Sequence, residues 1–132
     1  MRRTIAGVIV GLIAWALVVT VLNWGLRLWL PGYLQAEPSM VFTLTMKLAR
    51  LSIAVVSSLA AGALVRVVAP ASRWAPWIVG LIVLALFLPA HVSLWYRFPI
   101  WYHLTFLVPL VPLVVLGARV GSRTTAKPAL NA

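Results

Sequence analysis

The sequence predicts an all-α membrane protein, a bundle of four transmembrane helices arranged as two helical hairpins. Of its 132 residues, 64% are hydrophobic and 9% are charged, against about 45–50% and about 25% in an average soluble domain. A soluble domain of this size has too little interior to bury so much apolar surface. The apolar residues also fall into four runs long enough to cross a bilayer, flanked by tryptophan and tyrosine.

The first apolar run predicts a span at about residues 5–30. Its first part, from Ile5 to Leu22, contains nothing more polar than Thr20 and is long enough for one span. The run exceeds the apolar part of a usual signal peptide, so we expect a retained signal-anchor helix. It stops at Pro31-Gly32, a turn signal.

The second span is expected at residues 39–68, with Ser39 as its N-cap. The apolar stretch between Arg50 and Arg66 is only about 22 Å long, whereas the hydrocarbon core of a bilayer is about 30 Å thick. We therefore expect that Arg50 or Arg66 snorkels at the membrane boundary, or that Arg50 faces the interior of the bundle.

Residues 74–95 and 100–118 are expected to form the third and fourth spans. Prolines lie inside both of them, and each removes a backbone donor and bends its helix. A local opening between these two helices is therefore expected. With this hairpin, residues 1–120 make up the four-helix domain, and residues 121–132 are predicted to be a polar, disordered cytoplasmic tail. The prolines are Pro89 in the third span and Pro109 and Pro112 in the fourth.

The basic residues predict the orientation of the chain. Its net charge of +10 comes from eleven Lys and Arg against one acid, Glu37. Because the charges are scattered between apolar runs, they predict no nucleic-acid partner. By the positive-inside rule they place both termini in the cytoplasm. One side of the membrane would hold Arg2, Arg3, Arg66, Arg73, Arg119, Arg123 and Lys127, and the other Arg27, Lys47, Arg50 and Arg97.

Small residues predict how the helices pack, because membrane helices associate where small side chains let their backbones approach. Gly7 and Gly11 form such a site on the first helix, and Ala54, Ser58 and Gly62 recur every four residues on the second. We expect the two sets to face each other, or Gly7 and Gly11 to mediate self-association.

Most polar residues of the predicted spans lie toward the outer side. Ionisable groups at membrane depth are costly, so function is the first hypothesis for them. Arg50 and His91 lie deepest, although His91 could simply bond to a neighbouring helix. Lys47 and Arg50 share one helix face and could bind lipid headgroups or another anion, or merely anchor the helix. The candidate residues are Asn23, Lys47, Arg50, His91, Tyr102 and His103.

The composition excludes much catalytic chemistry. The chain has no cysteine and one acid, so thiol chemistry and paired-carboxylate catalysis are absent. No phosphate-binding loop or hydrolase motif occurs. We therefore expect no enzyme activity, catalytic residue, metal site or cofactor. Haem bound by His91 and His103 stays open as an alternative.

The stretch Phe98-Pro99-Ile100-Trp101-Tyr102-His103-Leu104-Thr105-Phe106-Leu107, followed by Pro112 and Gly117-Ala118-Arg119, resembles a group of small bacterial membrane proteins of about this length. That group is predicted to have four spans and has no assigned activity. The resemblance is specific around the Pro-x-Trp-Tyr-His segment. It implies a location in the bacterial inner membrane.

Three functions are compatible with these features. The first is a non-enzymatic accessory or scaffold module, whose partners are membrane lipid and either a second copy or another membrane protein. The second is a homodimeric transporter or channel for an anionic or lipidic solute. The third is a redox protein that binds haem.

Overall fold

The structure, a computed structural model, describes residues 2–39 and 41–130, with side chains described as far as residue 121. Over these residues it is helical, with no strand. Four segments are long and apolar enough to span a membrane: α1, α3, α4, and α5 with α6 as far as Gly121. This confirms the predicted fold class. The helices are α1 (Arg2–Trp29), α2 (Tyr33–Ala36), α3 (Leu44–Val68), α4 (Ala75–Ser93), α5 (Ile100–Leu107) and α6 (Leu110–Leu130).

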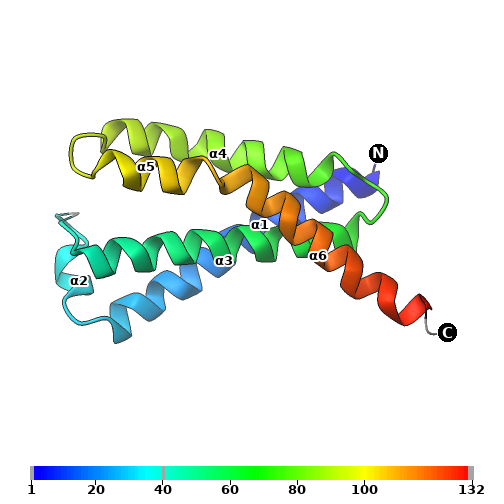
Figure 1. Cartoon of the computed structure of the whole chain (residues 1–132), viewed down its shortest axis with the longest axis horizontal. Coiled ribbons are helices and arrows are strands. Elements are labelled where there is room, and N and C mark those ends of the chain that lie inside the picture. The colour runs from blue at the N-terminus through cyan, green and yellow to red at the C-terminus, as the bar shows by residue number, and fades with distance from the viewer. Residues whose placement is uncertain (1, 40, 131–132) are drawn as a thin grey trace.

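The chain runs back and forth along the long axis of the bundle (Figure 1). The short helix α2 and the turn between α4 and α5 lie at one end, which we call the α2 end. Both ends of the chain and the turn between α3 and α4 lie at the other, the terminal end. The first hairpin is therefore α1 with α3, and the second is α4 with α5 and α6.

Helix α1 shows which of its faces meets lipid. Ile5, Ile9 and Ile13 are each more than half exposed and follow one another every four residues, so they form an apolar stripe that is suited to contact with lipid. Gly7 and Gly11 are buried on another face. The helix is followed by Gly32, whose φ of 80° lies in the left-handed region that favours glycine.

Helix α3 begins later than the sequence indicated. The expected N-cap at Ser39 is wrong, because Thr43 caps the helix: its side-chain oxygen accepts a hydrogen bond from the Met46 backbone N–H at 3.3 Å. The Ser39 hydroxyl instead donates to the Ala36 carbonyl at 3.2 Å. At the other end of α3, Arg66 Nη1 donates to the Pro70 carbonyl at 2.8 Å, so Arg66 holds the turn into α4.

The predicted fourth span is two helices. α5 ends at Leu107 and α6 begins at Leu110; Pro109 lies between them and has no N–H to donate to a continuous helix. By contrast, α4 continues unbroken past Pro89. α6 also continues to Leu130, so the segment expected to be disordered is helical up to that residue. Once a helix exists, each added residue gains one backbone bond. Residues 131–132 lie outside the described residues.

The backbones of α3 and α6 approach each other closely at two glycines, one of which, Gly62, was expected to face α1. A Cβ on Gly62 would overlap the Val114 carbonyl of α6, and one on Gly117 would overlap the Leu59 carbonyl of α3. Such approach is open only to residues without a side chain. Small residues thus join the first hairpin to the second.

The glycines of α1 pack within the same bundle. A Cβ on Gly7 would lie 2.9 Å from Ala69 Cβ, and one on Gly11 would lie 2.5 Å from a Val65 methyl. Within this chain, both glycines are therefore covered by neighbouring helices of the bundle. Helix α1 also bonds to the small-residue face of α3, since Trp15 Nε1 donates a hydrogen bond to Ser58 Oγ at 3.1 Å.

Candidate functional site

Arg50 on α3 points into the bundle at the α2 end. Its Nη1 donates to the Tyr33 hydroxyl at 2.7 Å, and its Nε donates to the Tyr102 hydroxyl at 3.1 Å. The guanidinium carbon lies 4.9 Å from the centre of the Phe42 ring, a distance for a cation–π contact. The sequence left open whether Arg50 snorkels at the membrane boundary or faces the interior of the bundle, and in the structure it faces the interior. It connects α2, α3 and α5.

No carboxylate neutralises Arg50 in the part of the chain that the structure describes. The ion pair found there joins Arg27 to Glu37, the single acid of the chain, with Arg27 Nε 2.7 Å from Glu37 Oε1. The two tyrosines are neutral partners and use only part of the five-donor guanidinium. Arg50 therefore keeps a full positive charge and unused N–H donors.

Glu37 and Tyr33 hold the connection between α1 and α2. Glu37 Oε2 accepts from Asn23 Nδ2 at 3.2 Å, and the Tyr33 hydroxyl donates to Asn23 Oδ1 at 2.8 Å. The hydrogen bond from Arg27 holds the pKa of Glu37 below its ordinary value, so this carboxylate stays charged at neutral pH. Burial raises the pKa of Tyr33, although the nearby Arg50 acts against this, so the hydroxyl keeps the proton that it donates.

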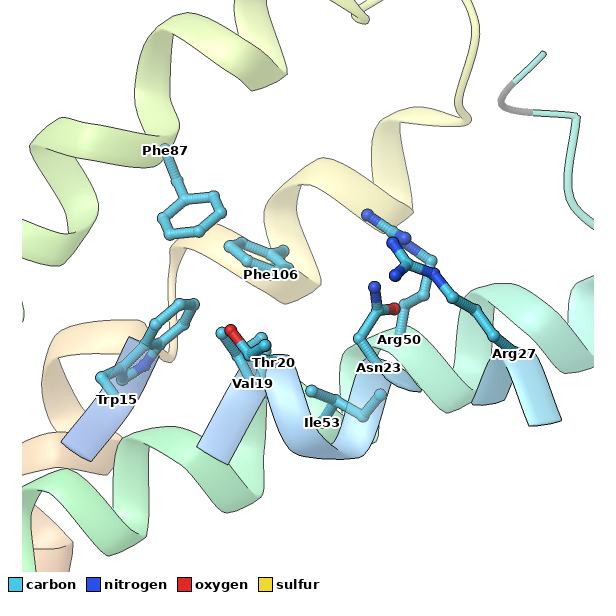
Figure 2. Close-up of a pocket in the computed structure, with 10 residues that line it drawn as sticks. Trp15, Val19, Thr20, Asn23, Arg27, Arg50, Ile53, Phe87 and Phe106 are labelled. Atoms are coloured by element: carbon cyan, nitrogen blue, oxygen red, sulfur yellow. The ribbon is translucent and has the colours of Figure 1, made fainter. Parts of the chain in front are cut away.

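Beside these residues lies a pocket of about 320 Å³ between the two hairpins, which we call the inter-hairpin pocket. Figure 2 shows its two parts: Asn23, Arg27 and Arg50 gather on one side, and the rings of Trp15, Phe87 and Phe106 lie on the other. The pocket is therefore amphipathic, with hydrogen-bond donors near the α2 end and apolar rings deeper. Its lining comprises Trp15, Val19, Thr20, Asn23, Arg27, Arg50, Ile53, Ala54, Phe87 and Phe106.

The two histidines form a separate buried pair. Nδ1 of His91 on α4 lies 2.7 Å from Nδ1 of His103 on α5. The rings also contact Tyr102, with centroids 6.1 Å and 6.0 Å away. Because each ring uses Nδ1 on the other, and His103 Nε2 is 3.3 Å from the Trp95 carbonyl, only His91 Nε2 is left without a bond. Axial haem ligation by both rings needs a free nitrogen from each, so this arrangement does not fit haem.

The candidate residues from the sequence thus separate into three places. Asn23, Arg50 and Tyr102 are joined through one hydrogen-bonded network, and the two histidines lie beside it. Lys47 lies elsewhere, at a hollow that it lines with Ser39, Val41, Phe42 and Arg97. Tyr33, which is fully buried and links Asn23 to Arg50, was not a candidate. From its position after Pro31-Gly32, the sequence indicated only an aromatic residue at a turn and gave no sign of these hydrogen bonds.

These features define the class of the chain: it is a multi-pass helical membrane protein with a polar network buried near one end of the bundle. Comparison with protein-family models, with curated proteins and with solved structures found no match. Among the described residues, no three His, Cys, Asp or Glu side chains gather as ligands for a metal ion.

Proposed function

We propose that this chain is a non-enzymatic accessory module of the bacterial inner membrane that binds one anionic, lipid-like amphiphile in the inter-hairpin pocket. The observation that carries the proposal is the charge of Arg50. Within the part of the chain that the structure describes, it has no carboxylate partner, and it lies at the polar end of a pocket whose other end is apolar.

The charges at the polar end favour an anion. Arg27 and Glu37 neutralise each other, whereas Arg50 adds one uncompensated positive charge. An unpaired charge at membrane depth is costly, and a bound anion would offset that cost. Asn23 and the unused N–H groups of Arg50 could donate hydrogen bonds to phosphate or carboxylate oxygens, the geometry for which a guanidinium is suited.

The apolar end favours an acyl chain on that anion. From Arg27 to Trp15 the pocket follows α1 for about 18 Å, a length that accommodates a headgroup and part of one chain. The rings of Phe87 and Phe106, 5.5 Å apart, and of Trp15, 4.9 Å from Phe87, form its deep wall. A small hydrophilic anion would leave this wall uncovered.

Native mass spectrometry from a neutral maltoside detergent tests the proposal. With equal amounts of phosphatidylglycerol and phosphatidylcholine of identical acyl chains, we expect one phosphatidylglycerol to be retained with about tenfold preference, the equivalent of about 1.4 kcal/mol. Equal retention of the two lipids would contradict anion selection. Displacement of the lipid by millimolar glycerol phosphate would show that the pocket binds a small free anion. This result would contradict the proposal that the ligand is an amphiphile.

We also propose that both termini face the cytoplasm. The support is the count of seven Lys and Arg residues on the side of the termini against four on the other. In a bacterial host, a green fluorescent protein fused to the C-terminus should fluoresce, and an alkaline phosphatase fused there should be inactive. An active phosphatase fusion would reverse the orientation.

A further inference from the structure

The histidine pair is a polar site that the proposed function does not use. His91 is 8% exposed and His103 is fully buried. Neither ring forms a hydrogen bond to Arg50, Tyr33 or Asn23. Two imidazoles in direct contact inside a membrane domain therefore need an account of their own.

The bonds of the pair determine where its hydrogens lie. A carbonyl oxygen has no hydrogen, so in the bond to the Trp95 carbonyl, His103 Nε2 must be the donor. A neutral imidazole has one N–H, so Nδ1 of His103 is an acceptor. The hydrogen between the rings must then belong to His91 Nδ1. This leaves His91 Nε2 with an unshared electron pair.

From this geometry we infer that His91 and His103 form a binding site for a single proton, which is taken up at Nε2 of His91. The added proton makes His91 an imidazolium, and its Nδ1–H then donates a charge-assisted, stronger hydrogen bond to His103. No existing hydrogen bond is lost. The neutral partner ring shares the new charge.

A second proton is excluded while the contact lasts. It would have to bind Nδ1 of His103, and two N–H donors would then face each other across 2.7 Å. The pair must separate before both rings are charged. Such coupled groups take up their protons in two distinct steps.

Among the described residues, no anionic side chain contacts the pair as a counter-ion for the bound proton. The charged side chain that interacts with His91 is Arg50 of α3, and the facing titratable group on α5 is the neutral Tyr102. Apolar rings also pack against the pair: the Phe106 ring lies 4.5 Å from that of His91, and the Trp95 ring lies 4.8 Å from that of His103. Glu37 is bound to Arg27. The site thus adds one positive charge to this region when it is occupied.

Solid-state nitrogen NMR of the full chain in lipid bilayers tests the site, because the protein has only two histidines. At alkaline pH we expect one ring protonated at Nδ1 and one at Nε2. As the pH falls, one ring should become an imidazolium while the other stays neutral over more than about one pH unit. Two Nε2-protonated rings, or two rings that charge in one step, would overturn the inference.

The variant His91→Gln is the matched control for the assignment. The remaining ring should keep its hydrogen on Nε2, because the Trp95 carbonyl still requires a donor there. A hydrogen on Nδ1 in this variant would contradict the tautomers deduced above. Should the variant fail to fold, the two unlike tautomers of the wild-type protein decide the question alone.

Discussion

Replacement of Gly62 by alanine is expected to destabilise the bundle by more than about 3 kcal/mol. The added Cβ would meet the Val114 carbonyl and lie 2.8 Å from the Ala118 nitrogen, both backbone atoms of α6. Backbone cannot rotate aside as a side chain can, so α3 and α6 must separate. Thermal unfolding in mild detergent, followed by tryptophan circular dichroism, measures the loss.

Two further alanine variants make this result specific. Gly117→Ala should be similarly damaging, because its Cβ would overlap the Leu59 carbonyl from the opposite helix. Gly25→Ala is the control: nothing lies within 4 Å of the added Cβ, and alanine favours a helix over glycine by about 0.5–1 kcal/mol. A Gly62→Ala protein as stable as Gly25→Ala would refute the close contact between α3 and α6.

Replacement of Arg50 by methionine, which is long and uncharged, is expected to weaken binding of phosphatidylglycerol about 10- to 100-fold. This follows from the loss of a charged hydrogen bond, worth about 1.5–3 kcal/mol. The preference over phosphatidylcholine should disappear with it. Lipid titration monitored by native mass spectrometry measures both quantities.

Lys47→Met is the matched control for Arg50→Met. It removes the same charge from the same helix, three residues away, but Lys47 lies outside the inter-hairpin pocket. We expect less than about a twofold change in lipid affinity, because Lys47 does not line the pocket and its charge does not reach a headgroup held there. Equal losses in the two variants would mean that the lipid responds to net charge and not to the pocket. Helical circular dichroism of both variants checks that they are folded.

The spans could be predicted from sequence because hydropathy and length decide them locally. Their ends could not, since capping depends on conformation: Thr43 and Ser39 are both plausible caps, and only Thr43 reaches the N–H of Met46. The break of the last span at Pro109 was likewise ambiguous, because α4 accommodates Pro89 without a break.

The contacts between helices were less accessible to sequence analysis. The interior position of Arg50 was one expected alternative, but its partners Tyr33 and Tyr102 are 17 and 52 residues away. Their meeting depends on the turn at Gly32 and on the rotation of α5. A signal for the α3–α6 contact did exist: Gly117 and Gly121 form the same G-x-x-x-G spacing as Gly7 and Gly11.

The contact between the two histidines was likewise not accessible to sequence analysis. Their positions predicted two rings near one surface of the membrane domain. The direct contact of His91 with His103 depends on the turn between α4 and α5. Trp95 lies in this turn, and its carbonyl accepts a hydrogen bond from His103. This pairing occupies Nδ1 of both rings, which favours a proton-binding site over a haem site.

A distance measurement tests most directly whether the charge of Arg50 holds an anionic headgroup. In maltoside detergent, which contains no phosphorus, the protein is mixed with one equivalent of phosphatidylglycerol and studied by carbon–phosphorus dipolar NMR. We expect the lipid phosphorus to dephase an arginine guanidinium carbon in the wild-type protein and in Lys47→Met, but not in Arg50→Met. The same dephasing in Arg50→Met would contradict this expectation.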